Sequence, residues 1–290
     1  MSGTGEITAA NLVRGTNLPT LPEAYLELRA AIDSETTDIE DIAKLLTRDP
    51  VMCAKTLKLA NSAYFSSGRS VETIDDAIHI IGTDVLATIA MSVYVLDVFF
   101  GIDSDLVDMK KFWKQSIRMG ISAGRIAKFC LSSNQYTDRF FIASMLSRIG
   151  KLVLYIESPE IASEVIKQAE EEHVPKFFVE EKILGFTHAA VSYELLKLWG
   201  LPPTIYEPVL YYIYPENVPS QYMLTAYLIH AAYYMQFAWF HNGEANFIDF
   251  PSRTNDRAFE YLKIRTMDLM MCTNLIDDEF QLLCNNFNLD

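Results

Sequence analysis

Apolar residues recur at helical spacing through almost the whole chain, whereas the alternating runs typical of strands are scarce. The segment 74–81 is a clear case, because Ile74, Ala77, Ile78 and Ile81 follow the i, i+3, i+4, i+7 pattern of a helix with one buried face. Hydrophobic residues make up 50% of the 290 residues, so such helices can bury their apolar faces in a sizeable core. The pattern predicts an all-α globular protein.

Capping residues indicate where several helices begin. Asp49 followed by Pro50 is typical of a helix N-terminus, because the carboxylate accepts backbone N–H groups and proline fits the first turn. Asp38 and Thr73 offer the same kind of cap to the segments that follow them, and Gly82 can end the second of these. Further helices are expected over 83–99, 109–130, 137–156, 158–172, 176–184, 188–198, 203–213, 218–240, 256–272 and 276–286.

The stretch 99–108, FFGIDSDLVD, carries a glycine, a serine and three aspartates, and it is the best candidate for a subdomain boundary. We therefore expect one domain over 15–240, built from an N-terminal helical subdomain and a central one. A short N-terminal tail precedes this domain, and a loop with two helices follows and packs on it. The expected segments are 1–14, 15–100, 109–240 and 241–290.

Charge and composition exclude several classes of protein. A net charge of −14 disfavours non-specific nucleic-acid binding, which depends on basic residues that neutralise phosphates. The apolar stretches 85–100 and 222–240 contain Asp97, His230 and Gln236, so they resemble buried helices more than membrane spans. The N-terminus lacks the features of a signal peptide, and the four cysteines form no CxxC pair. We therefore expect a cytoplasmic protein with reduced thiols.

One helix is unusually basic. The segment 109–128 has six basic residues and no acidic one, and the basic side chains fall within about 100° of one another on a helix. They are either a solvated face that pairs with acids elsewhere in the chain or a patch for an acidic partner or a phosphate-bearing ligand. The opposite side carries small residues such as Gly120 and Ala123, which allow another helix to approach closely. The six basic residues are Lys110, Lys111, Lys114, Arg118, Arg125 and Lys128.

Six segments in a fixed order resemble the HDOD family, a group of bacterial all-α proteins related to HD-type metal-dependent phosphohydrolases. The resemblance runs from about residue 15 to residue 215 and extends into the segment 218–240. It implies two packed helical subdomains and a role in signal transduction. The segments are LPTLPEAYLEL, RDPVMCAKTLKLANSAYF, SVETIDDAIHIIG, FWKQS, FIASMLSRIGKLVL and FTHAAVSYELLKLWGLP.

The resemblance also implies that a metal centre has been lost. Catalytic HD relatives carry an adjacent His-Asp pair where this chain has Ser147 and Arg148. In those relatives the aspartate bridges metal ions, the histidine adds a nitrogen ligand, and metal-bound water attacks phosphorus. Serine offers only a neutral oxygen, and arginine is a permanent cation that repels a metal ion.

The other ligand positions are altered as well. Gln115 stands where the relatives often have a histidine, and Tyr212 and Ile213 occupy the place of a His-His pair. Tyr233 stands where a distal aspartate would close the site, so that only His188 matches a ligand clearly. One histidine does not hold a catalytic metal ion. The resemblance therefore implies no catalytic residue, no bound metal and no cofactor.

Two roles remain open for Arg148. It either pairs with a carboxylate on a neighbouring helix and fills the former metal pocket, which we favour, or binds a ligand phosphate through two N–H groups. Lys151, one turn further on, is expected to extend its amine to the surface. The candidate residues for binding a ligand or partner are Lys111, Lys114, Arg118, Arg125, Arg148 and Lys151.

Three functions are compatible with these patterns. The leading one is a non-catalytic regulatory module that binds an unidentified signalling protein, supplied in trans, and has no nucleic-acid partner. The second is a metal-dependent phosphohydrolase whose carboxylates come from elsewhere, for example Asp138 or Glu194. The third is a sensor that binds a nucleotide or another anion in the former metal pocket through Arg148. The patterns specify neither the oligomeric state nor the identity of the partner.

Overall fold

The regular structure of the described residues is helical, and no strand occurs among them. This confirms the all-α prediction. The computed structural model describes residues 7–15, 18, 21–34, 37–61, 71–100, 105–131, 137–240, 256–265, 268, 276–281, 283–284 and 289.

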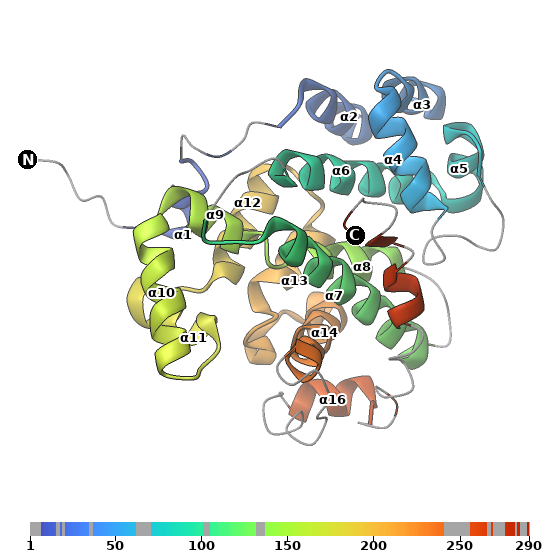
Figure 1. Ribbon diagram of the computed structural model, residues 1–290. Coiled ribbons are helices and arrows are strands. Elements are labelled where there is room, and N and C mark those ends of the chain that lie inside the picture. Colours follow the sequence, from blue (N-terminus) through green and yellow to red (C-terminus); the bar gives the residue numbers. More distant parts are fainter. Residues whose placement is uncertain are drawn as a thin grey trace, which may run out of the picture.

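The N-terminal helices form one side of the molecule. They are α2 (Glu23–Asp33), α3 (Ile39–Thr47), α4 (Pro50–Ala60), α5 (Ile74–Ile81) and α6 (Thr83–Phe100). Figure 1 shows α2 to α5 gathered around α6, whose other neighbour is a helix of the central group. The predicted caps are confirmed, because Asp38, Asp49 and Thr73 each accept a backbone N–H of the helix that follows. Gly82 ends α5 with a φ of 87°, a conformation that glycine adopts without strain.

The central group surrounds a long, mostly buried helix, α7. Its members are α7 (Met109–Cys130), α8 (Thr137–Leu146), α9 (Gly150–Glu157), α10 (Pro159–Glu171), α11 (Lys176–Leu184), α12 (His188–Leu198), α13 (Pro203–Tyr211) and α14 (Met223–Phe240). α7 packs against α8 and α14, while α12 packs against α9 and α13. In Figure 1, α7, α8, α13 and α14 lie at the centre of the molecule, and α9, α10 and α11 lie on the side away from α3 to α5.

The predicted helix over 137–156 is wrong, because a turn at residues 147–149 divides it into α8 and α9. One local and one long-range hydrogen bond with serine hydroxyls accompany the turn. The Ser147 hydroxyl donates to the Ser144 carbonyl at 2.7 Å, and the Gly150 amide donates to the Ser192 hydroxyl at 2.8 Å. Both helices bury apolar faces in the same core, so the hydrophobic spacing runs through the turn without a visible break. The predicted helix over 218–240 also begins later, at Met223, after two short 3-10 turns.

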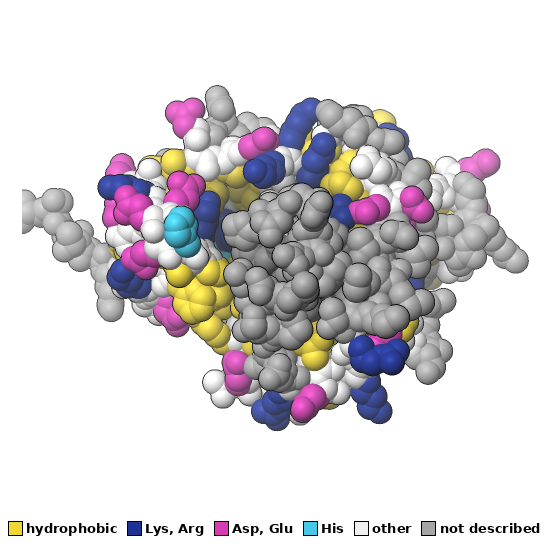
Figure 2. Space-filling view, turned by 60° about the horizontal axis from the view of Figure 1, so that its bottom comes forward, with side chains coloured by type: hydrophobic (Ala, Val, Ile, Leu, Met, Phe, Trp, Pro, Cys, Tyr) yellow, Lys and Arg dark blue, Asp and Glu magenta, His cyan; other side chains and the backbone are white. Residues whose placement is uncertain are grey.

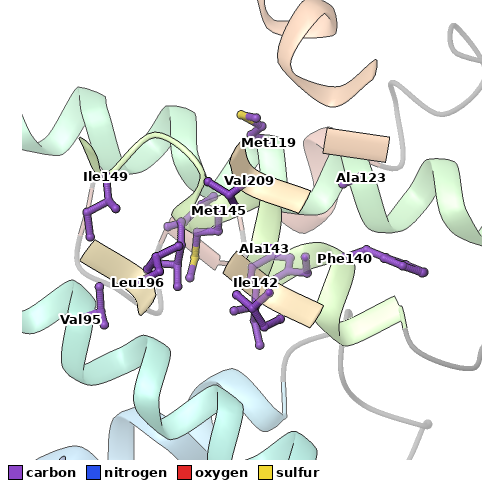
Figure 3. Packing of buried hydrophobic residues seen from close by; sticks show 14 of the residues in the cluster. Val95, Met119, Ala123, Phe140, Ile142, Ala143, Met145, Ile149, Leu196 and Val209 are labelled. Atoms are coloured by element: carbon purple, nitrogen blue, oxygen red, sulfur yellow. The ribbon is translucent and has the colours of Figure 1, made fainter. Parts of the chain in front are cut away.

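The core joins the two groups of helices. Figure 3 shows part of it, in which Val95 of α6, Met145 of α8 and Leu196 of α12 belong to one buried cluster. The small-residue side of α7 permits the close approach that the sequence predicts, since a Cβ added to Gly120 would lie 2.9 Å from the Phe141 carbonyl oxygen of α8. The core therefore holds α6, α7, α8 and α12 in fixed positions around the site described below.

The two ends of the chain contribute to this packing. Residues 9–12, which lie in the expected N-terminal tail, form the short helix α1 (Ala9–Leu12), and α1 packs against α9 and α12. Near the C-terminus, α16 (Asp256–Leu262) packs on α14 and is shorter than the predicted 256–272 helix. Residues 276–281 are helical, as predicted for the start of the last helix. The predicted polar loop after α14 lies outside the described residues over 241–255.

Two further expectations concern the membrane and the cysteines. Among the described residues, no helix combines the length and apolar character that a membrane crossing requires. Cys53, Cys130 and Cys284 are free thiols, and only Cys284 is fully buried. Cys272 lies outside the described residues.

Candidate functional site

A cavity of about 520 Å³ lies where the central helices meet. It contains three of the positions that the family resemblance assigns to a former metal centre, Gln115, Arg148 and Tyr233. The segments that build it are the start of α7, the turn between α8 and α9, α9 itself, the start of α11 and α14. The lining residues are Leu106, Val107, Asp108, Lys111, Phe112, Gln115, Arg148, Lys151, Tyr155, Lys176, Tyr233 and Gln236.

Arg148 is held in place by two glutamine side chains. Its Nη2 donates to Gln115 Oε1 at 3.0 Å, and its Nη1 donates to Gln236 Oε1 at 3.2 Å. Gln236 Nε2 in turn donates to the backbone carbonyl of Gln115. The guanidinium carbon lies 5.5 Å from the centre of the Phe112 ring, within the range of a cation–π contact. The turn and these contacts therefore fix the direction of the guanidinium group.

The expected carboxylate partner of Arg148 is not what the structure shows. The recorded side-chain partners of Arg148 are neutral amides, which orient the guanidinium group but do not neutralise it. Its Nε–H is buried and has no hydrogen-bond partner among the described residues. The side chain is only 8% exposed, so a full positive charge lies inside the protein.

Lys151 also differs from its prediction, because its side chain is buried and not extended to the surface. The residue is 7% exposed, and its ammonium nitrogen lies 5.9 Å from the centre of the Tyr233 ring. Burial, together with the nearby charges of Arg148 and Lys176, lowers the pKa of Lys151 to about 7 against the attraction of Glu180. Burial is also the main cause that lowers the pKa of Lys176. The cavity thus contains amines that water and carboxylates do not fully stabilise.

His188 sits at the first position of α12, after the N-cap Thr187. Its Nδ1 lies 2.6 Å from Glu180 Oε2, and its Nε2 lies 2.6 Å from the hydroxyl of Tyr212. Burial lowers the pKa of His188 to about 4 and raises the pKa of Tyr212 well above its usual value. At neutral pH, Nδ1–H therefore donates to Glu180, and Nε2 accepts from Tyr212.

Glu180 is a site residue that the sequence analysis missed. It is 3% exposed, and one of its oxygens accepts both Nδ1–H and the backbone N–H of His188. Burial alone would raise its pKa, but His188 and Lys151 lower the pKa of Glu180 to about 2. Nothing in the sequence separates Glu180 from its exposed neighbour Glu181. For Gln236, also missed, a signal exists, since an amide in a very apolar helix needs a buried partner.

The structure gathers most of the positions that the resemblance assigns to a metal centre. The rings of Tyr212 and Tyr233 pack edge to face with centroids 5.2 Å apart, and Ile213 is buried beside Tyr212. Ser147 is fully buried and does not line the cavity, since its hydroxyl serves the turn between α8 and α9.

The basic residues of α7 divide into two groups. Lys111 lines the cavity, whereas Lys114, one turn further on, does not. Arg118 and Arg125 form ion pairs with Asp277 and Glu279 near the C-terminus. The interpretation of the basic stripe as a face that pairs with acids elsewhere therefore holds for these two arginines.

The side chains present do not fit a metal ion. A permanent cation, Arg148, occupies one of the positions that the resemblance assigns to metal ligands and contacts another, Gln115. Tyr212 holds the Nε2 atom through which His188 would bind a metal. Within the described ranges, no group of three His, Cys, Asp or Glu side chains has the geometry of a metal site. Glu194 does not line the cavity, and the side chain of Asp138 lies outside the described part of the chain. No described carboxylate rebuilds the centre.

The buried histidine leads to a prediction about acid. The pKa of His188 falls from 6.5 in the unfolded chain to about 4, so the unfolded chain binds more protons between these values. The stability that neutral His188 contributes is therefore present above pH 6.5 and is lost as the pH falls towards 4. Denaturant titrations should show that the free energy of unfolding of wild type falls by about 1 kcal/mol more than that of His188→Gln between pH 6.5 and pH 5.

A matched control distinguishes this effect from the general acid sensitivity of the protein. His173 is exposed and has a positive φ of 53°, which asparagine tolerates, so His173→Asn should retain the wild-type pH dependence. Burial also lowers the pKa of His230 to about 4. Because His230 is unchanged in all three proteins, its contribution to the pH dependence of stability is the same in each. Equal losses in wild type and His188→Gln would contradict the prediction.

Comparisons with known proteins agree with this arrangement of helices. The HDOD domain profile matches residues 18–215. An HDOD domain protein from Geobacter sulfurreducens has a TM-score of 0.73 at 20% identity, over 96% of this chain and 98% of that one. A structure from Shewanella amazonensis SB2B has a TM-score of 0.71 at 22% identity, over 96% of this chain and 100% of that one. A protein of Treponema pallidum (strain Nichols) is 25% identical over 219 residues, and the match spans 76% of this chain but only 42% of that protein.

Proposed function

The chain belongs to the HDOD family, whose profile matches residues 18–215, and from this premise we propose that it is a regulatory module that acts by binding and not by hydrolysis. One observation carries the proposal. Arg148, fixed by Gln115 and Gln236, occupies the position where the family resemblance places part of the His-Asp pair of catalytic HD relatives. A cation at that point opposes the binding of a second cation, and the hydrolysis carried out by those relatives depends on metal-bound water.

The buried hydrogen bonds around His188 support the same proposal. In a metal site, a ligating histidine donates one ring N–H to a carboxylate and leaves the other nitrogen for the metal. His188 retains the first half of this arrangement through Glu180. The other nitrogen accepts from Tyr212, so a phenol takes the role that a metal ion would have. Both ring nitrogens of His188 thus have hydrogen-bond partners within the protein, which supports a role that does not depend on a metal.

We propose a bacterial, cytoplasmic setting in which the module responds to a signalling protein or a small ligand. The residues 15–100 and 109–240 would form the two subdomains of this module, with the segment 241–290 packed against them. The ion pairs of Arg118 with Asp277 and of Arg125 with Glu279 support that packing.

The metal content of the purified, untagged protein tests the proposal. Elemental analysis for Mn, Fe, Co, Ni and Zn after dialysis should give far less than one metal ion per chain. The protein should also release no nitrophenolate from 4-nitrophenyl phosphate when Mn²⁺ is added. Stoichiometric metal that survives dialysis, or turnover that His188→Gln abolishes, would contradict the proposal and favour a phosphohydrolase.

A further inference from the structure

We propose that the cavity binds a small organic phosphate, with a doubly charged phosphoryl group beside the buried cations and a flat apolar group against the aromatic wall. This inference rests on the proposed function, because it assumes a site that binds without hydrolysis. It adds the chemical class of the ligand, which the family assignment does not provide.

The charge of the cavity is the first argument. Of the residues that the structure describes, four basic ones line it, Lys111, Arg148, Lys151 and Lys176, against a single carboxylate, Asp108. Asp108 already caps α7, because its side chain accepts the backbone N–H of Lys111 at 3.0 Å. Since the whole chain carries a net charge of −14, an excess of cations in one cavity is a local feature. On the face in Figure 2, by contrast, the described basic and acidic side chains are interspersed.

The burial of the cations is the second argument. Arg148 and Lys151 are 8% and 7% exposed, and neither has a recorded ion pair with a carboxylate among the described residues. Glu180 attracts Lys151, but its hydrogen bonds go to His188, so neither cation has a hydrogen-bonded carboxylate among the described residues. Buried charges that lack such a partner are destabilising, and they point to a negative group supplied from outside. The buried Nε–H of Arg148 also has no acceptor within the described ranges of the chain. The two glutamines fix the guanidinium group before a ligand arrives, which reduces the entropy lost on binding.

The shape of the cavity is the third argument. Lys111 is exposed and Lys176 half-buried, so these two amines lie nearer to solvent than Arg148 and Lys151. Phe112, Tyr155 and Tyr233 provide aromatic surface in the same cavity. Its volume of about 520 Å³ is within the usual range of small-molecule sites, about 300–1,000 Å³.

A phosphoryl group matches these features better than a carboxylate does. A phosphate monoester carries a charge of about −1.5 to −2 at neutral pH and three strong acceptor oxygens. One such group can accept N–H bonds from an arginine and a lysine at the same time, whereas a carboxylate brings only a single charge. The aromatic residues would then contact the group to which the phosphate is attached.

Calorimetric titration of the full chain with 4-nitrophenyl phosphate tests the inference. We expect one saturable site per chain. The singly charged probe 4-nitrobenzenesulfonate should bind at least about tenfold more weakly, because fewer charge-assisted hydrogen bonds form. Lys111→Gln should weaken the binding of 4-nitrophenyl phosphate by about tenfold. Lys111 is exposed, so this substitution leaves the buried core unchanged.

Lys114→Gln is the matched control, because it makes the same change on the same helix at a side chain that does not line the cavity. It should leave the affinity within about twofold of wild type once the probe is titrated at moderate salt. No saturable binding, equal affinity for the two probes, or equal losses in the two lysine variants would each overturn the inference. Release of yellow nitrophenolate during the titration would instead contradict the proposed non-catalytic function.

Discussion

Replacing Gly150 with alanine is expected to lower the free energy of unfolding by about 3 kcal/mol. Gly150 begins α9 immediately after the turn that carries Arg148, and it lies directly against the start of α12. A Cβ at this position would lie 2.6 Å from the backbone nitrogen of Ser192 and closer still to the carbonyl oxygen of His188. Neither atom can move without shifting α12, so the usual gain from Gly→Ala in a helix is outweighed. Denaturant titration measures the loss.

Ser192→Ala separates the steric effect from a lost hydrogen bond. The Ser192 hydroxyl accepts the Gly150 amide at 2.8 Å, so its removal alone should cost about 1 kcal/mol. The double variant Gly150→Ala/Ser192→Ala should not recover stability, because the closest clashes are with backbone atoms. A Gly150→Ala protein as stable as wild type, or full rescue by Ser192→Ala, would show that α9 and α12 approach less closely than described.

Lys151→Met is expected to have the opposite effect on stability and to weaken the binding of 4-nitrophenyl phosphate by about tenfold. Methionine has a similar length and fills the same apolar space without burying a charge. The free energy of unfolding at pH 7 should therefore rise by about 1 kcal/mol, as is common where a functional group is held at a cost in stability. Thermal or chemical denaturation measures the first effect, and calorimetry measures the second.

The pH dependence of stability gives the Lys151→Met prediction an independent readout. The pKa of Lys151 falls from 10.5 to about 7 on folding, so between these values the unfolded chain binds more protons than the folded protein. Wild-type stability therefore gains from this residue as the pH rises from 7 towards 10.5, and Lys151→Met should lack that gain. Lys114→Met provides the control outside the cavity. If Lys151→Met were less stable than wild type at both pH 7 and pH 9, the buried ammonium would not be destabilising.

Local chemistry explains why so many helix starts were predictable. A side chain such as Asp49 or Thr73 caps the helix that follows it within three residues, so the signal and its effect lie in the same short segment. The break at Ser147 was not predictable in the same way. One of its hydrogen bonds joins Gly150 to Ser192, which lies 42 residues further along the chain. Hydrophobic spacing carries no information about such a partner.

In the candidate site, too, some residues were predictable from the sequence and their long-range contacts were not. Family resemblance identified Gln115, Arg148, His188, Tyr212 and Tyr233, and the structure brings all of them to one region. The resemblance did not identify the hydrogen-bond partners of these residues, because those partners depend on how distant helices pack.

Long-range packing also explains the errors about the two buried cations. An amide oxygen of Gln236 reaches Arg148 from 88 residues away, where a carboxylate was expected. Lys151 was expected at the surface because a lysine chain is long enough to reach water from most helix positions. Here the neighbouring helices close over it, and Tyr233 contacts its ammonium group.

The cavity takes its walls from four segments that are distant in the chain, between Leu106 and Gln236. A ligand that touches all of them would act as a cross-link between the helices that carry these segments. Amide hydrogen exchange should then slow at the start of α7, in α9, at the start of α11 and in α14 together when the cavity is filled. The concentration of the ligand would thus set the fraction of molecules whose central bundle is rigid. A partner that binds the rigid form would respond to that fraction.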